Sequence, residues 1–194
     1  MKIKLITIII VLGIFTTCLF AQYDFTVSGG VHLGNIGYDT ESGFRDTSPR
    51  PGATIGIETL KGPFIIGAAF VRRGGNLEIS SINYSESISL DYLTAYLLFN
   101  IPIIDDLNGL FGCQIGDCMG GTFTYEQDGD SGSVTIYTNT FNIDYGLLFG
   151  VDYMLNSRLG TRVSYYSGYA GVFKNSVSSN FSNSGISICL LFKI

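Results

Sequence analysis

Apolar and polar residues alternate along most of the chain from Tyr23 onward. Between residues 23 and 34 the apolar side chains take odd positions, while polar side chains and glycines take even positions. Alternation with a period of two predicts a β-strand with one apolar and one polar face. The apolar residues take odd positions again in 141–153, and even positions in 88–98 and 186–194. With four weaker repeats, the pattern predicts eight strands, at 23–34, 53–59, 64–73, 88–98, 111–125, 141–153, 159–169 and 186–194.

The connections between these segments alternate in length. Those after the second, fourth and sixth segments are compact (61–63, 100–108 and 155–157), whereas those after the odd segments are long and rich in Gly, Ser, Asn and Asp (39–50, 74–86, 126–139 and 174–180). An even strand count with short turns at one end and long loops at the other is typical of bacterial outer-membrane barrels. Because a bilayer offers backbone groups no water, an apolar-faced sheet that crosses it must close on itself. The predicted fold class is all-β, an eight-stranded antiparallel up-and-down transmembrane β-barrel over residues 22–194, with its termini in the periplasm.

A soluble eight-stranded barrel, such as a lipocalin, also alternates, but its apolar face lines the interior. Here the face opposite the apolar one carries glycine, serine, threonine and isolated charges, which favours a barrel with its apolar face toward lipid. Aromatic residues gather near the strand ends, as expected of interfacial girdles. They are Tyr23, Phe64, Phe111, Tyr153 and Phe192 toward the short turns, and Phe70, Tyr125, Phe141 and Tyr169 toward the long loops.

The first 21 residues have the pattern of a secretory signal peptide. Lys2 and Lys4 precede an apolar stretch at 6–14, and Ala21 supplies a small residue at the expected cleavage position. A membrane helix is the alternative, although the stretch is short for a span. Lipid attachment at Cys18 is another, without the small residue expected before such a cysteine. Cleavage after Ala21 leaves 9 basic and 16 acidic residues, a net charge of −7.

The composition excludes several classes of protein. Only 14% of the 194 residues are charged, 46% are hydrophobic and 25 are glycine, which argues against a disordered chain or a coiled coil. A net charge of −5 provides no basic surface for nucleic acid. The remaining cysteines, Cys113, Cys118 and Cys189, lack the spacing of a zinc site or a disulfide framework. We interpret them as apolar fillers, with a Cys118–Cys189 bridge left open.

Four stretches resemble the porin-like outer-membrane β-barrel family, of the PorT-like kind. They are Y-L-T-A-Y-L-L-F-N-I-P at 92–102, the glycine-rich 109–121, D-Y-G-L-L-F-G at 144–150 and T-R-V-S-Y-Y-S-G at 161–168. The resemblance implies a small barrel with no catalytic residues and no cofactor. It also implies that the outer-membrane insertion machinery reads the last strand, with Phe192 serving in place of the usual final aromatic residue, where Ile194 stands.

An eight-stranded barrel is just wide enough for its own side chains. Its inward positions are predicted to combine charges of both signs, as buried charges require. His32 is the single histidine, and an enzyme using a Ser–His pair or a metal would have to be built around it; we interpret it as a network member instead. The predicted structural network in the lumen consists of His32, Glu58, Arg73, Asp91, Gln114, Asp144 and Arg162.

Two further acidic features need an interpretation. Glu126, Asp128 and Asp130 could attract a divalent cation, but they lack the further spaced ligands of a calcium loop, so a solvated loop is favoured. Asp117 falls on the predicted lipid-facing side of its strand. Because glycines flank it, we predict a β-bulge that turns Asp117 inward or places it above the apolar band.

These features favour a monomeric, non-enzymatic outer-membrane protein with a plugged polar interior. Its outer loops, such as 39–50, are then expected to serve structural or binding roles. The expected partners are outer-membrane lipids and an envelope protein, with no nucleic acid. A narrow pore for small solutes, an accessory component of a secretion or adhesion complex, and an enzyme acting on envelope lipids are the alternatives.

Overall fold

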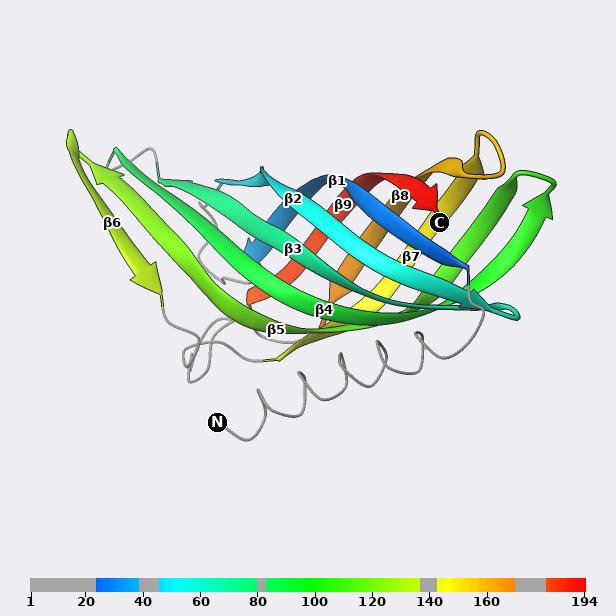
Figure 1. The fold of residues 1–194 in the computed structure, drawn as a ribbon. Helices are drawn as coiled ribbons and strands as arrows, with labels where there is room; N and C mark the ends of the chain where they lie inside the picture. The colour runs from blue at the N-terminus through cyan, green and yellow to red at the C-terminus, as the bar shows by residue number, and fades with distance from the viewer. Residues whose placement is uncertain (1–23, 39–45, 80–82, 137–142, 170–180) are drawn as a thin grey trace.

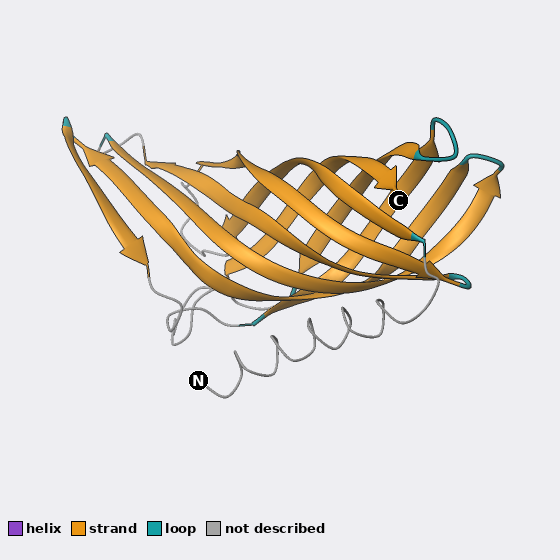
Figure 2. Ribbon diagram, viewed as in Figure 1, coloured by secondary structure: helices purple, strands orange, loops and turns teal. Residues whose placement is uncertain are grey.

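The computed structural model describes residues 24–38, 46–79, 83–136, 143–169 and 181–194, and strands make up almost all of them (Figure 2). The predicted signal peptide, residues 1–21, lies outside the described residues. No helix in the described part of the chain is long and apolar enough to cross a membrane. The strands are β1 (Phe25–Tyr38), β2 (Asp46–Lys61), β3 (Phe64–Ile79), β4 (Tyr84–Ile104), β5 (Leu107–Gln127), β6 (Asp130–Ile136), β7 (Asp144–Met154), β8 (Leu159–Gly168) and β9 (Phe181–Lys193).

Eight of these strands form a closed antiparallel ring. Each pairs with the next along the chain, β5 pairs with β7, and β9 returns to β1. The predicted eight-stranded up-and-down barrel is therefore confirmed. The predicted long connection at 74–86 is wrong, because β3 runs to Ile79 and β4 begins at Tyr84, which leaves only residues 80–83 between them. At the other end of the barrel the three connections are short, as predicted: residues 62–63, residues 105–106 and residues 155–158. The C-terminus lies at the same end of the barrel as these turns (Figure 1).

β6 lies outside the ring and pairs with β5 alone among the described strands. The sequence predicted a loop at 126–139, but residues 126–127 continue β5 and residues 130–136 turn back as β6 to form a hairpin. Asp128 and Gly129 form the turn, with φ of 50° and 91°. Two positive φ angles match the twist of a two-residue hairpin, which Asp-Gly adopts readily. The polar composition that indicated a loop therefore builds a solvent-exposed hairpin.

The half of the barrel nearer the short turns, which we call the lower part, has an apolar outer surface. Val31 of β1, Val151 of β7 and Leu190 of β9 are 54%, 42% and 60% exposed, on the faces predicted to be outward. Four phenylalanines, Phe64, Phe99, Phe111 and Phe149, face one another across successive strand pairs. Their rings lie 5.4 Å apart in the first pair and 5.2 Å in the last. This surface belongs in lipid.

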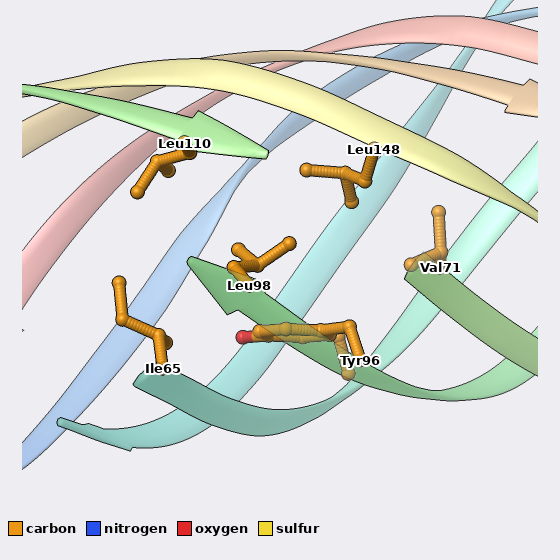
Figure 3. Close-up of a cluster of buried hydrophobic side chains, with 7 residues drawn as sticks. Ile65, Val71, Tyr96, Leu98, Leu110 and Leu148 are labelled. Carbon is orange, nitrogen blue, oxygen red and sulfur yellow. The ribbon is translucent and has the colours of Figure 1, made fainter. Parts of the chain in front are cut away.

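The face assigned to the strand at 88–98 is wrong. Its even residues point into the barrel, where Tyr92 and Leu98 are 0% and 1% exposed, while Leu97 and Phe99 face outward. Both faces of this part of β4 are apolar, so alternation could not identify the outward one. The inward residues pack in a core: Figure 3 shows Tyr96 and Leu98 beside Ile65 and Leu110.

The polarity of the sheet reverses at the ion pair between Arg72 and Asp91, which lies on the outer surface. Below it the outward residues are apolar; above it they are Ser85, Ser87 and Ser89 of β4, and their neighbours on the adjoining strands are also polar. Inside the barrel above the pair, Ile36, Ile88, Leu90, Tyr92 and Cys118 form an apolar core. The upper sheet thus has the polarity of a soluble β-structure.

A β-bulge in β5 lies at this reversal. Asp91 pairs with Gly120 and Tyr92 with Cys118, so Met119 is the extra residue. The predicted bulge is confirmed. For Asp117 the sequence predicted either an inward rotation or a position above the apolar band. Asp117 keeps its outward orientation opposite Leu93, at the upper border of the apolar belt, so the inward rotation does not occur. Cys113, Cys118 and Cys189 are free thiols, so the bridge left open by the sequence does not form.

Candidate functional site

The lower half of the barrel interior is filled by an ionic cluster around Arg162 of β8. The guanidinium donates two hydrogen bonds of 2.7 Å to the carboxylate of Asp152 and two, of 2.6 and 2.8 Å, to that of Glu58. The hydroxyl of Tyr96 donates to Glu58 over 2.8 Å. All four residues are buried. Because one guanidinium holds two carboxylates from two strands, the cluster ties β2, β7 and β8 together across the lumen.

A second cluster lies higher and is centred on the ion pair between Arg73 of β3 and Asp144 of β7. The amide of Asn183 donates to Asp144 over 3.3 Å and to the hydroxyl of Tyr92 over 3.0 Å. The guanidinium of Arg73 also lies 4.0 Å from the ring centre of Tyr166 and 5.2 Å from that of Tyr92. Such cation–π contacts stabilise a desolvated charge.

His32 joins the interior as a neighbour of Ser187. Its Nδ1 lies 2.8 Å from the hydroxyl of Ser187, and its Nε2 has no hydrogen-bond partner among the described residues. A Cβ added at Gly185 or Gly34 would lie 2.6 or 3.2 Å from Nε2, so both glycines leave room for the ring. The geometry contains a Ser–His contact without a carboxylate to orient the histidine, which a catalytic triad needs.

The structure thus joins Glu58 to Arg162 and Arg73 to Asp144, and it buries Gln114 and His32 in the same interior. The predicted position of Asp91 in the lumen is wrong. It lies on the outer face of β4, paired with Arg72, because the inward positions of that strand are the even ones.

Sequence reasoning missed several members of the interior. Asp152 faces inward on β7, as Asp144 does, because both stand at even positions of that strand. This shared even position could have revealed Asp152. The others gave no such indication, because two lay on the misassigned face of β4 and two are ordinary polar residues of β9. They are Tyr92, Tyr96, Asn183 and Ser187.

The upper parts of β3, β4 and β5, with β6, form what we term the projecting sheet: residues 73–79, 84–90, 121–127 and 130–136 (Figure 1). Its outer face carries hydroxyl, amide and carboxyl groups: the Ser87 hydroxyl donates to the amide oxygen of Asn76 over 2.7 Å, and Glu78 and Glu126 flank Ser85. Its inner face carries apolar and aromatic side chains around Glu86, which lies opposite Leu77 and Tyr125, and toward the tip Tyr125 and Val134 are 39% and 53% exposed.

The acidic residues at the turn of this sheet, Glu126, Asp128 and Asp130, all lie in the described part of the chain. Within the described ranges, no group of three or more His, Cys, Asp or Glu residues is placed to hold a metal ion. Asp128 is a turn residue whose backbone conformation explains its presence.

Comparison with known protein families and with curated proteins finds no match. Among solved structures, the chain is similar to Neisserial surface protein A (NspA), with a TM-score of 0.56 and 14% identity over 88% of this chain and 97% of that one. It is also similar to Ail, the attachment invasion locus protein of Yersinia pestis, with a TM-score of 0.51 and 13% identity over 90% of this chain and 100% of that one.

The chain has the fold of a small outer-membrane β-barrel. The whole ring takes part in this likeness, since nearly the full length of each chain is covered. At such low identity the likeness concerns the fold alone. The apolar belt on the outer surface of the barrel and the ionic clusters inside agree with that fold.

Proposed function

We propose that this outer-membrane barrel is a non-enzymatic binding protein that contacts a protein partner through its projecting sheet. The observation that carries the proposal is the reversal of polarity at Arg72 and Asp91. Above that pair the sheet no longer has a lipid-facing surface, yet β4 and β5 continue to 21 residues each and gain β6 as a further strand. Strands this long exceed the 9–11 residues that cross a bilayer.

The inner face of the projecting sheet is the expected contact surface. The ring centres of Phe123 and Tyr125 lie 6.2 Å apart, with the rings tilted by 41° to each other. Val134 lies opposite Phe123 on β6. Aromatic and aliphatic side chains of this kind serve as anchors in protein interfaces, where serine is depleted. The serine-rich outer face is therefore suited to contact with solvent, and the inner face to contact with a protein partner.

The barrel interior supports the non-enzymatic part of the proposal. The two ionic clusters join opposite walls, and an apolar core that includes Tyr96 and Leu98 occupies a further part of the interior. A lumen filled in this way leaves no wide path for a solute. A narrow pore is the second candidate function, and planar-bilayer recordings with stable, large conductance steps would favour it.

A matched pair of positions on β6 tests the binding proposal. A photo-cross-linking amino acid in place of Val134 faces inward, and the same residue in place of Thr135, one position along, faces outward. On irradiation of intact cells we expect a cross-linked protein adduct with the first variant and none with the second. Equal adducts from both positions, or no adduct from Val134, would contradict a partner on the inner face.

Three finer assignments accompany this proposal. The strand patterns at 92–102 and 144–150 support placing the chain with PorT-like barrels. The C-terminal strand β9, whose outward face ends in Phe192 and which Ile194 follows, is proposed as the segment read by the insertion machinery. The closed ring needs no second copy to pair its strands, which supports a monomer in the lipid of the outer membrane.

A further inference from the structure

The projecting sheet is strongly acidic above Arg73, which is itself buried in the barrel and paired with Asp144. Beyond that residue, the strands of the sheet and the β5–β6 turn contain no Lys, Arg or His, but they contain five carboxylates: Glu78, Glu86, Glu126, Asp128 and Asp130. The guanidinium of Arg50 in β2 donates to the hydroxyl of Ser87, so the outer face has a cation at its border. Within the described strands of the sheet, the inner face has no such cation above Arg73.

Two of the carboxylates share the inner face with an exposed aromatic ring. Glu86 lies opposite Tyr125 across the β4–β5 pair, and Tyr125 lies opposite Gly132 across the β5–β6 pair. Asp130 stands two residues before Gly132 on β6 and therefore points to the same face. Side chains directly opposite each other in a sheet begin about 5 Å apart, and diagonal ones about 7–8 Å apart. The ring of Tyr125 thus has one carboxylate on the β4 side and one on the β6 side.

Gly132 determines where this ring lies. A Cβ added at Gly132 would be 2.4 Å from Cζ of Tyr125 and 2.5 Å from its hydroxyl oxygen, so the ring packs over the backbone of β6. Tyr125 nevertheless stays 39% exposed, which leaves the other face of its ring open. The hydroxyl of Tyr84 donates to Glu86 over 3.1 Å and orients that carboxylate.

An open aromatic face between two carboxylates suits a basic side chain, because the ring attracts a cation and each carboxylate adds a charged hydrogen bond. We propose that the partner of the projecting sheet has a basic surface, and that one of its arginine side chains docks on Tyr125 between Glu86 and Asp130. The planar guanidinium of arginine can stack on the ring while it donates to carboxylates at its edges. A second copy of this chain is a poor partner here, since its own projecting sheet bears the same five carboxylates.

This inference rests on the proposed contact of the inner face with a protein, and a defined probe tests the site without that protein. Isotope-labelled protein in phospholipid nanodiscs is titrated with N-acetyl-arginine amide or with its uncharged citrulline analogue. We expect saturable shifts of the Tyr125 and Gly132 amide NMR signals with the arginine compound, and none with the citrulline compound. Equal shifts with both compounds would overturn the proposal.

Matched variants assign the binding to these residues. Glu86→Gln should weaken binding of the arginine compound about threefold or more, whereas Glu78→Gln, the same change on the outer face, should alter it less than about twofold. Tyr125→Leu, which keeps an apolar side chain, should weaken binding about threefold through loss of the cation–π contact. Equal effects of the two glutamate variants, or full binding by Tyr125→Leu, would overturn the proposal.

The photo-cross-linking residue at Val134 separates this inference from the proposed function. In intact cells, Glu86→Gln with Asp130→Asn should reduce the Val134 adduct about fivefold or more, whereas Glu78→Gln with Glu126→Gln, which neutralise two outer carboxylates, should leave most of it. An adduct that both pairs of substitutions reduce equally, or that neither reduces, would overturn the basic contact and leave the binding function standing. No adduct in the otherwise unchanged protein would overturn the binding function and this inference together.

Discussion

At the scale of residues, the buried charges hold the barrel together because Arg162 and Glu58 each have more than one partner. Arg162 bonds to Glu58 and Asp152 through both edges of its guanidinium, and Tyr96 completes Glu58. The alternation of odd and even positions along the strands could predict Glu58 and Arg162 as inward residues. It could not predict which charges meet, because contact across a lumen depends on the stagger of eight strands.

Removal of the central cation is expected to be costly. In Arg162→Met two carboxylates stay buried without a counter-charge, and the free energy of unfolding should fall by about 3–5 kcal/mol. Urea unfolding in vesicles, followed by the gel mobility of folded and unfolded forms, measures this. The triple variant Arg162→Met, Glu58→Gln, Asp152→Asn should lose less than the single one. A single variant that loses under about 1 kcal/mol would show that the cluster is not a stabilising unit.

A glycine opposite Tyr96 offers a second test at this scale. A Cβ at Gly67 would overlap the Tyr96 ring, whereas a Cβ at Gly29 meets nothing within 4 Å. Gly67→Ala should displace the ring, disturb its hydrogen bond to Glu58 and reduce stability by about 1–3 kcal/mol. Gly29→Ala should change it little. The same unfolding assay compares the two, and equal effects would argue against tight packing at Tyr96.

At the scale of elements, the sequence predicted the ring strands well and two features poorly. Single-sided alternation in β1, β7 and β9 identified the lipid-facing residues because their other face is polar. Between the Arg72–Asp91 pair and the short turn, β4 is apolar on both faces, so the alternation could not tell which face points outward. β6 was missed because Asp, Gly and Ser dominate it, and a hairpin outside the membrane tolerates such residues in its strand.

The reversal of polarity within β4 is testable with two arginines on one face. Leu97 and Ser89 both point outward, the first within the apolar belt and the second above the Arg72–Asp91 pair. Leu97→Arg should destabilise the folded barrel by about 2–4 kcal/mol, while Ser89→Arg should cost about 0–1 kcal/mol. Folding into vesicles of each variant measures the difference. Similar costs at both positions would place the membrane boundary elsewhere.

At the scale of the whole molecule, the barrel combines two structures in one sheet. The lower part is apolar outside and holds both an ionic cluster and an apolar core inside, and the upper part is polar outside with an apolar core around Leu90 and Tyr92. The bulge at Met119 lies where the two meet and resets the register of β5. Because the upper sheet has its own core, it can extend beyond the lipid without support from the membrane.

This arrangement fixes an orientation that epitope insertion can test. The β5–β6 turn at Asp128 and Gly129 lies at the end of the projecting sheet, and the β4–β5 turn at Asp105 and Asp106 lies at the opposite end of the same strand (Figure 1). A short epitope inserted after Gly129 should bind antibody on intact cells, whereas one inserted between Asp105 and Asp106 should bind only after the outer membrane is opened. Both variants must first show the gel shift on boiling that marks a closed barrel. Exposure of the second epitope on intact cells would reverse the barrel in the membrane, and the projecting sheet would then face the periplasm, where its partner would have to be an envelope protein.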